Sequence, residues 1–80
     1  MKIAIIGLGF VGLSLTSVLA SKGFNIVGID VDKEKCKNIS NGVSPFFEPN
    51  LEKTLKKGLK NKLQIESDMS VVQDLSLIHI

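Results

Sequence analysis

The chain has 80 residues, which is enough for one small domain or for part of a larger one. Its apolar content is globular, and its ten basic residues against eight acidic ones leave a net charge of only +2. All ten basic residues are lysines, which argues against nucleic acid as a partner, because arginine clusters interleaved with aromatic side chains would be expected there.

The first 30 residues have the order strand, glycine turn, helix, strand. Residues 2–6 are an apolar strand, which ends at the segment Gly7-Leu8-Gly9-Phe10-Val11-Gly12. Residues 10–22 follow as a predicted helix, with Gly23 well placed to end it. Residues 25–30 are a second strand that finishes on Asp30. A G-x-G-x-x-G segment placed between strand and helix, with an acid roughly 20 residues later, predicts a dinucleotide site.

Each glycine of this segment has a physical task. Gly7 allows the sharp turn from strand to helix, and Gly9, which lacks a Cβ, allows a pyrophosphate to approach the backbone. Gly12 allows the helix to pack close to the strand. The helix then directs its unpaired N–H groups and its positive dipole end at the phosphates, so no basic side chain is needed there.

Asp30 bears on whether the site prefers NAD or NADP. Its carboxylate can accept hydrogen bonds from both hydroxyls of an adenosine ribose and would repel a 2′-phosphate, so NAD is favoured over NADP. In an alternative interpretation, the glycines only allow tight turns and Asp30 only caps a helix. The presence of both elements in register favours the dinucleotide site.

The helix over residues 10–22 has four apolar residues that we expect to form one buried face: Val11, Leu15, Val18 and Leu19. The uncharged run from Ile3 to Ser21 also has the character of a secretory signal peptide and approaches the length of a membrane span. The three glycines at dinucleotide spacing argue against both, and we expect no membrane association.

The remaining elements are predicted in chain order. Asp32 caps a short helix that reaches about Asn41 and is closed by Gly42. Residues 43–49 form a loop with two prolines, and Pro49 begins a third helix. That helix carries an apolar stripe formed by Leu51, Leu55 and Leu59. Residues 63–65 are a strand candidate, Ser67 caps a short helix through Gln73, and residues 75–80 form another strand.

Two other features have structural interpretations. Cys36 is the single cysteine, so no internal disulfide can form; we expect a buried thiol in a protein of the reducing cytoplasm. Five lysines form a basic stretch that we interpret as the solvated face of a helix, with a phosphate-bearing partner as the alternative. They are Lys53, Lys56, Lys57, Lys60 and Lys62.

This element order predicts an α/β fold, namely a Rossmann-like, doubly wound parallel sheet truncated after about the fourth strand. Two more strands would complete a six-stranded dinucleotide domain. We therefore expect residues 1–80 to be a partial amino-terminal NAD-binding domain, with the substrate and carboxyl-terminal domains absent.

Three segments together resemble the amino-terminal domain of the UDP-glucose / GDP-mannose 6-dehydrogenase family. They are the turn from Gly7 to Gly12, Asp30 with Lys35, and Ser44-Pro45-Phe46-Phe47-Glu48-Pro49-Asn50-Leu51. The resemblance covers residues 1–74. This chain has Phe10 where the family commonly has tyrosine, and Asn50 where it commonly has glycine.

The resemblance implies an NAD-dependent oxidation of a sugar-nucleotide alcohol to a carboxylate in two hydride transfers. UDP-glucose is the first choice of substrate, and GDP-mannose and UDP-N-acetyl sugars are the alternatives. It implies that Gly7, Gly9, Phe10, Val11 and Gly12 contact the pyrophosphate, and that Asp30 and Lys35 lie at the adenosine ribose. It also implies a homodimer for the full-length protein.

The family's catalytic cysteine lies later in the protein, so this chain is expected to hold no catalytic residue and no metal site. Cys36 does not match that position, and Glu48 is given no chemistry. The sugar contacts are expected beyond Ile80.

Two rival functions share the opening strand, glycine turn and acid. One is a regulatory NAD-sensing module of a potassium uptake system, and the other is a dehydrogenase of the hydroxyacid or hydroxyacyl-CoA kind. The loop and helix over residues 44–51 favour the nucleotide-sugar enzyme over the sensing module.

Overall fold

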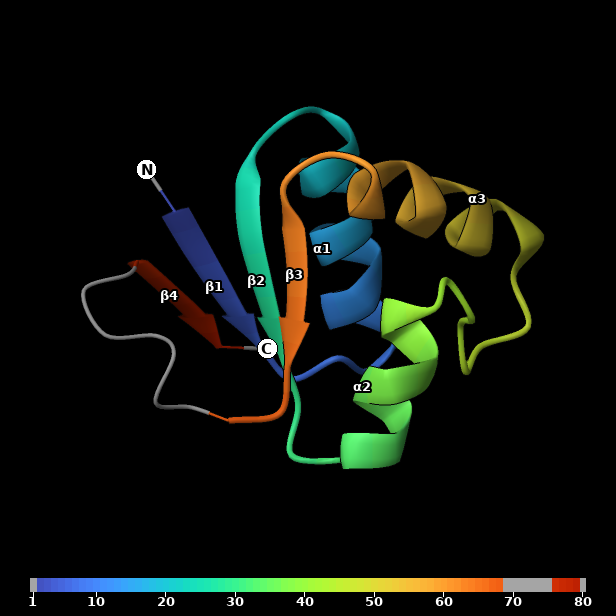
Figure 1. Cartoon of the computed structure of the whole chain (residues 1–80), viewed down its shortest axis with the longest axis horizontal. Helices are drawn as coiled ribbons and strands as arrows, with labels where there is room; N and C mark the ends of the chain where they lie inside the picture. Colours follow the sequence, from blue (N-terminus) through green and yellow to red (C-terminus); the bar gives the residue numbers. More distant parts are fainter. Residues whose placement is uncertain (1, 69–75, 80) are drawn as a thin grey trace.

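A parallel four-stranded sheet organises the chain, with strand order β3-β2-β1-β4 (Figure 1). The computed structural model describes residues 2–68 and 76–79. Its elements are, in chain order, β1 (Lys2–Ile6), α1 (Phe10–Ser21), β2 (Asn25–Ile29), α2 (Lys33–Ser40), α3 (Pro49–Leu59), β3 (Leu63–Glu66) and β4 (Ser76–His79). This order is that of the first four strands of a Rossmann-like sheet, which confirms the predicted fold class.

Strand register brings the end of β1 beside the end of β2. Ile6 is paired with Ile29, and Ile29 is paired with Glu66 of β3. All described strands are parallel, so their carboxyl ends meet at one edge of the sheet. The glycine turn follows β1 at this edge and Asp30 follows β2, which places the two halves of the predicted site together.

Alternation along the strands divides the core between the two faces of the sheet. One face contributes Ile5 and Ile26 to a large apolar cluster that includes Leu13 of α1 and Leu55 of α3. The other face carries a smaller cluster of Ala4, Val27 and Ile29. The described helices α1, α2 and α3 all lie on the same side of the sheet in Figure 1. The predicted stripe of α3 is confirmed, because Leu51 and Leu55 are buried and Leu59 packs against the large cluster.

The predicted buried face of α1 is wrong in part. Val11 is 63% exposed and Val18 is 42% exposed, while Leu15 and Leu19 only pack at the margin of the core. The residues that are buried are Gly12, Leu13, Thr16, Ser17 and Ala20. This helix is apolar on most sides, so the pattern of large residues does not identify its core face; small residues occupy that face because the neighbouring elements approach closely.

Helix ends follow the predicted residues. Gly23 and Gly42 have φ values of 98° and 82°, in the left-handed region that favours glycine after a helix. Asp32 caps α2 by accepting a hydrogen bond from the Lys35 N–H at 3.0 Å. The helix predicted over residues 67–73 lies mostly outside the described residues. Within the described part of the chain, no helix has the length and apolarity needed to cross a bilayer.

Helices α1 and α3 touch at two small residues. A Cβ placed on Gly58 would lie 2.9 Å from the Cβ of Ala20, and neither position has a side chain that could move aside. We expect Gly58→Ala to lower the free energy of unfolding by about 1–2 kcal/mol, because overpacking outweighs the higher helix propensity of alanine. Denaturant unfolding measures this, with Lys57→Ala, an exposed position on the same helix, as the control. Adding Ala20→Gly should relieve the clash; a purely additive double variant would contradict this contact.

Candidate functional site

The turn after β1 is held open to solvent at Gly9. Gly7 has a φ of 96°, so it makes the predicted sharp turn, and its N–H donates to the Ile29 carbonyl at 2.8 Å. Leu8 is fully buried beneath the turn. Gly9 is exposed, and a Cβ placed on it would meet no residue within 4 Å other than its chain neighbours, so the backbone here faces solvent.

The amino terminus of α1 differs from those of the other described helices. Its N-cap is Gly9, which offers no side-chain acceptor, and its first turn contains no acidic residue. By contrast, Asp32 caps α2 and Glu48 caps α3, and each of these helices has a glutamate in its first turn. The first intrahelical hydrogen bond of α1 runs from the Leu13 N–H to the Gly9 carbonyl, so the N–H groups before it have no acceptor within the helix. This end of α1 is therefore suited to a bound anion.

Asp30 connects the turn to β2. Its Oδ2 accepts a hydrogen bond from the Leu8 N–H at 2.9 Å and from Lys35 Nζ at 3.1 Å, while its Oδ1 accepts from the Asp32 N–H at 3.0 Å. A carboxylate has about four acceptor positions, so three are filled and one remains, on Oδ1. The sequence predicts hydrogen bonds from Asp30 to both ribose hydroxyls, but this geometry leaves an acceptor position for only one unless Lys35 moves.

Three partners set the charge of Asp30. Burial by itself would raise the pKa of this carboxyl, but hydrogen bonds from the N–H groups of Asp32 and Leu8 and the nearby Lys35 ammonium hold its pKa below the usual value. The Asp30 side chain is 11% exposed and that of Lys35 is 25% exposed, so this ion pair is only partly screened by water. Lys35, predicted near the adenosine, thus lies beside the same carboxylate.

Phe10 and Val11 begin α1 and are both more than half exposed, beside the open space at Gly9. The ring of Phe10 meets the ring of Phe46 edge to face, with centroids 5.5 Å apart and planes at 83°. The structure thus places the glycine turn in contact with the loop before α3, two segments that are related in the sequence only by the family resemblance. Gly12 is buried, and its predicted close approach to the strand stays a prediction.

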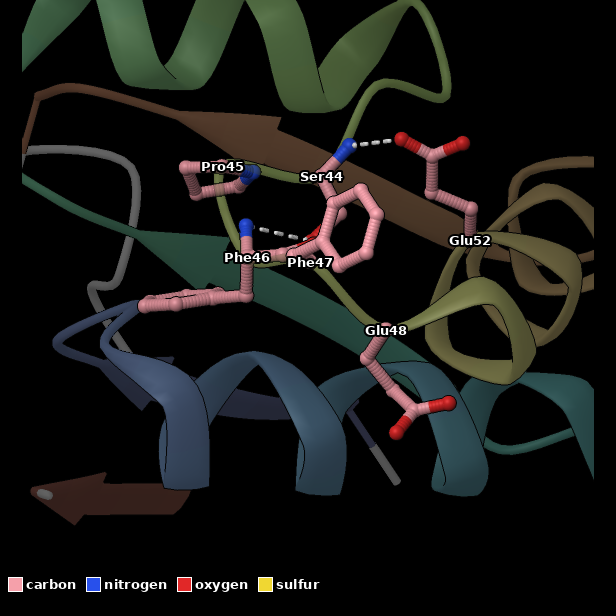
Figure 2. A pocket seen from close by; sticks show the side chains of 6 residues that line it. All are labelled: Ser44, Pro45, Phe46, Phe47, Glu48 and Glu52. Carbon is pink, nitrogen blue, oxygen red and sulfur yellow. Dashed lines mark hydrogen bonds between the residues drawn. The ribbon is translucent and has the colours of Figure 1, made fainter.

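The loop over residues 44–48 is fixed at both ends (Figure 2). The Ser44 N–H donates to Glu52 Oε2 at 2.9 Å, and the Ser44 hydroxyl accepts from the Phe46 N–H at 3.0 Å. Glu48 accepts from the Asn50 N–H at 3.1 Å as the cap of α3. The expectation that Glu48 has no chemical role did not include this cap, which its position directly before Pro49 could have indicated. A cavity of about 340 Å³ is lined by Ser44, Pro45, Phe46, Phe47, Glu48 and Glu52.

Cys36 has a structural role, as expected. It is 6% exposed, and its Sγ lies 3.3 Å from the Asp30 carbonyl oxygen and 3.4 Å from that of Glu66. Burial raises the pKa of this thiol, which disfavours the reactive thiolate. Among the residues described by the structure, no group of three or more His, Cys, Asp or Glu side chains could hold a metal ion.

Comparison with known proteins identifies a family that the chain matches. The NAD-binding domain of the UDP-glucose/GDP-mannose dehydrogenase family matches residues 1–80. A GDP-mannose 6-dehydrogenase of Pseudomonas syringae pv. tomato is 42% identical over 98% of the chain, and a UDP-N-acetyl-D-mannosamine dehydrogenase of Pyrococcus horikoshii is 39% identical over 81%. These matches cover 19% and 16% of the two enzymes, so the chain spans less than a fifth of their length.

Solved structures agree with the sequence matches. A structure of the UDP-D-ManNAc dehydrogenase from Pyrococcus horikoshii superposes over 100% of the chain with a TM-score of 0.92 and 33% identity, covering 20% of that enzyme. A ternary complex of GDP-mannose dehydrogenase from Pseudomonas aeruginosa superposes over 85% of the chain with a TM-score of 0.80 and 38% identity, covering 16% of that enzyme. The resemblance seen in the sequence is confirmed, and NAD is the cofactor of this domain family.

The lowered pKa of Asp30 predicts an acid-dependent stability. A depressed native pKa contributes stability above the unfolded value of about 3.9, and this contribution is lost as pH falls through the native pKa. We expect wild-type unfolding free energy to fall below about pH 4 more steeply than that of Asp30→Asn. Denaturant unfolding across pH 2–6 measures the difference. Parallel curves for the two proteins would show that Asp30 is not stabilised as an anion.

Proposed function

Because the chain belongs to the UDP-glucose/GDP-mannose dehydrogenase family as its NAD-binding domain, we propose that it is the amino-terminal cofactor-binding part of a nucleotide-sugar 6-dehydrogenase. The full-length protein oxidises a sugar-nucleotide alcohol to the uronate in two hydride transfers. The uncapped, acid-free amino terminus of α1 beside the open backbone of Gly9 is the observation that carries this proposal. Bound NAD supplies the hydride acceptor, and the residues of this chain hold it.

The pyrophosphate is assigned to the turn between β1 and α1. The N–H groups that precede the first helical hydrogen bond of α1 donate to the phosphate oxygens, and the helix dipole favours the negative charge. Gly7 sets the turn and Gly9 leaves the approach clear. Gly12 is assigned the close approach of α1 to the sheet. Phe10 and Val11 flank the phosphates with apolar surface.

The adenosine ribose is assigned to Asp30 and Lys35. The free acceptor position on Asp30 Oδ1 takes one ribose hydroxyl, while Lys35 Nζ, 3.1 Å from Oδ2, lies close enough to reach the other. A 2′-phosphate would bring two further negative charges to a carboxylate that is held ionised, so NADP is disfavoured.

UDP-glucose is the first candidate for the sugar nucleotide, and a UDP-glucose dehydrogenase from Pyrobaculum islandicum superposes with a TM-score of 0.76 over 80% of the chain at 29% identity. GDP-mannose is the second candidate, because the 42% identical relative from Pseudomonas syringae is named a GDP-mannose 6-dehydrogenase. In this proposal the sugar contacts and the cysteine nucleophile lie in other parts of the protein. We also propose that the full-length protein is a homodimer in the cytoplasm.

Cofactor preference tests the role of Asp30. We expect NAD to bind the full-length protein at least about tenfold more tightly than NADP, a difference of about 1.4 kcal/mol. The 80-residue chain alone should bind NAD weakly and show no turnover, since the remaining wall of the site is outside it. Calorimetric titration with both nucleotides measures the preference. Tighter binding of NADP would contradict the assignment of Asp30, and turnover by the chain alone would contradict the proposed division of the site.

Substrate identity is tested with a panel of nucleotide sugars. The full-length protein with NAD should oxidise UDP-glucose, releasing two NADH for each uronate formed, since two hydrides are transferred. GDP-mannose and UDP-N-acetylmannosamine are the matched comparisons, and UDP without a sugar is the control. A kcat/KM highest for GDP-mannose would select the second candidate. Reduction of NAD with none of these compounds would reject the proposed function.

A further inference from the structure

The ring of Phe10 stands at the entrance to the proposed phosphate site. Phe10 is the first residue of α1, directly after the N-cap Gly9, and its side chain is 52% exposed. Apart from its chain neighbours Leu8 and Phe10, no residue comes within 4 Å of a Cβ placed on Gly9. A half-exposed aromatic side chain in this position can adopt a second staggered rotamer unless another group restrains it.

Phe46 supplies that restraint. Its ring meets the ring of Phe10 in an edge-to-face arrangement, which aromatic pairs prefer. Phe46 is half-buried and packs against the large core cluster, and this packing restrains its side chain. Figure 2 shows its ring directed toward the start of α1.

Hydrogen bonds also restrain the backbone of Phe46. Its N–H donates to the Ser44 hydroxyl oxygen at 3.0 Å, and its carbonyl accepts from the Ser44 hydroxyl at 3.2 Å and from the Glu48 N–H at 2.9 Å. Glu52 in turn holds the Ser44 N–H. The loop therefore presents one aromatic ring to Phe10 in a single orientation.

The adjacent residue provides an internal contrast. Phe47 has the same side chain in the same loop, yet it is fully exposed, at 105% of its reference area. In Figure 2 its ring does not point toward α1. Substituting each phenylalanine in turn therefore distinguishes the effect of the ring that contacts Phe10 from the effect of removing any aromatic ring from the loop.

We propose that Phe46 is a positioning residue for the cofactor: it holds the Phe10 ring beside the amino terminus of α1 and keeps the space over Gly9 clear for the pyrophosphate. This inference rests on the proposed function of the turn as a phosphate site. When the Phe46 ring is removed, Phe10 is free to occupy the space that the phosphates need. Binding of the adenosine end, at Asp30, does not depend on this contact.

The test uses the full-length protein and two ligands. We expect Phe46→Leu to weaken NAD binding about two- to tenfold, the range that an aromatic pair contributes. Binding of adenosine, which has no phosphates, should be unchanged. Phe46→Tyr, which keeps the ring, should bind NAD as the wild type does, and Phe47→Leu is the matched control that should have no effect. Calorimetry measures NAD binding, and ligand-observed NMR measures adenosine binding.

A double variant shows whether Phe46 acts through Phe10. If it does, Phe10→Leu combined with Phe46→Leu should bind NAD as weakly as Phe10→Leu alone. Unchanged NAD affinity in Phe46→Leu, equal losses for NAD and adenosine, or additive losses in the double variant would each overturn the inference. Phe46→Met, which keeps the apolar bulk, replaces Phe46→Leu if that variant does not fold. Failure of the wild-type protein to bind NAD would reject the proposed function instead.

Discussion

The hydrogen bond from the Leu8 N–H to Oδ2 of Asp30 ties the turn after β1 to the end of β2. It joins residues that are 22 positions apart in the chain, so it forms only when β1 and β2 are paired in register. Because the donor is a backbone group of a fully buried residue, leaving it without an acceptor would be unfavourable. The shape of the glycine turn, and with it the direction of α1, therefore depends on a hydrogen-bond acceptor in the side chain at this one position.

The same edge of the sheet is supported from a second direction by the loop before α3. The loop is held by Ser44, Glu52 and the Glu48 cap, and it meets the turn through the Phe10–Phe46 ring pair. The proposed phosphate site thus lies between two rigid supports, one polar and one aromatic. Such preorganisation lowers the entropy lost when a ligand binds, because the groups that meet it are already ordered.

Much of this arrangement could be predicted from the sequence. Strands, caps and the glycine turn follow from local rules that act over a few residues, and Gly7, Gly23, Asp32 and Gly42 all behave as their types require. The core face of α1 was mispredicted, because small residues are buried there by the close approach of α3, which no local pattern reports. The Phe10–Phe46 contact was missed for a related reason: it joins segments whose relation only the folded chain establishes.

The two roles of Asp30 limit how its cofactor preference can change during evolution or design. A shift toward NADP ordinarily requires loss of the acid at the end of β2, so that a 2′-phosphate can be accepted. In this chain the same substitution would also remove the acceptor of the Leu8 N–H and the ionic partner of Lys35. A successful switch would therefore need a residue that still accepts the Leu8 N–H, such as serine or asparagine, and Lys35, once released, could then pair with the added phosphate.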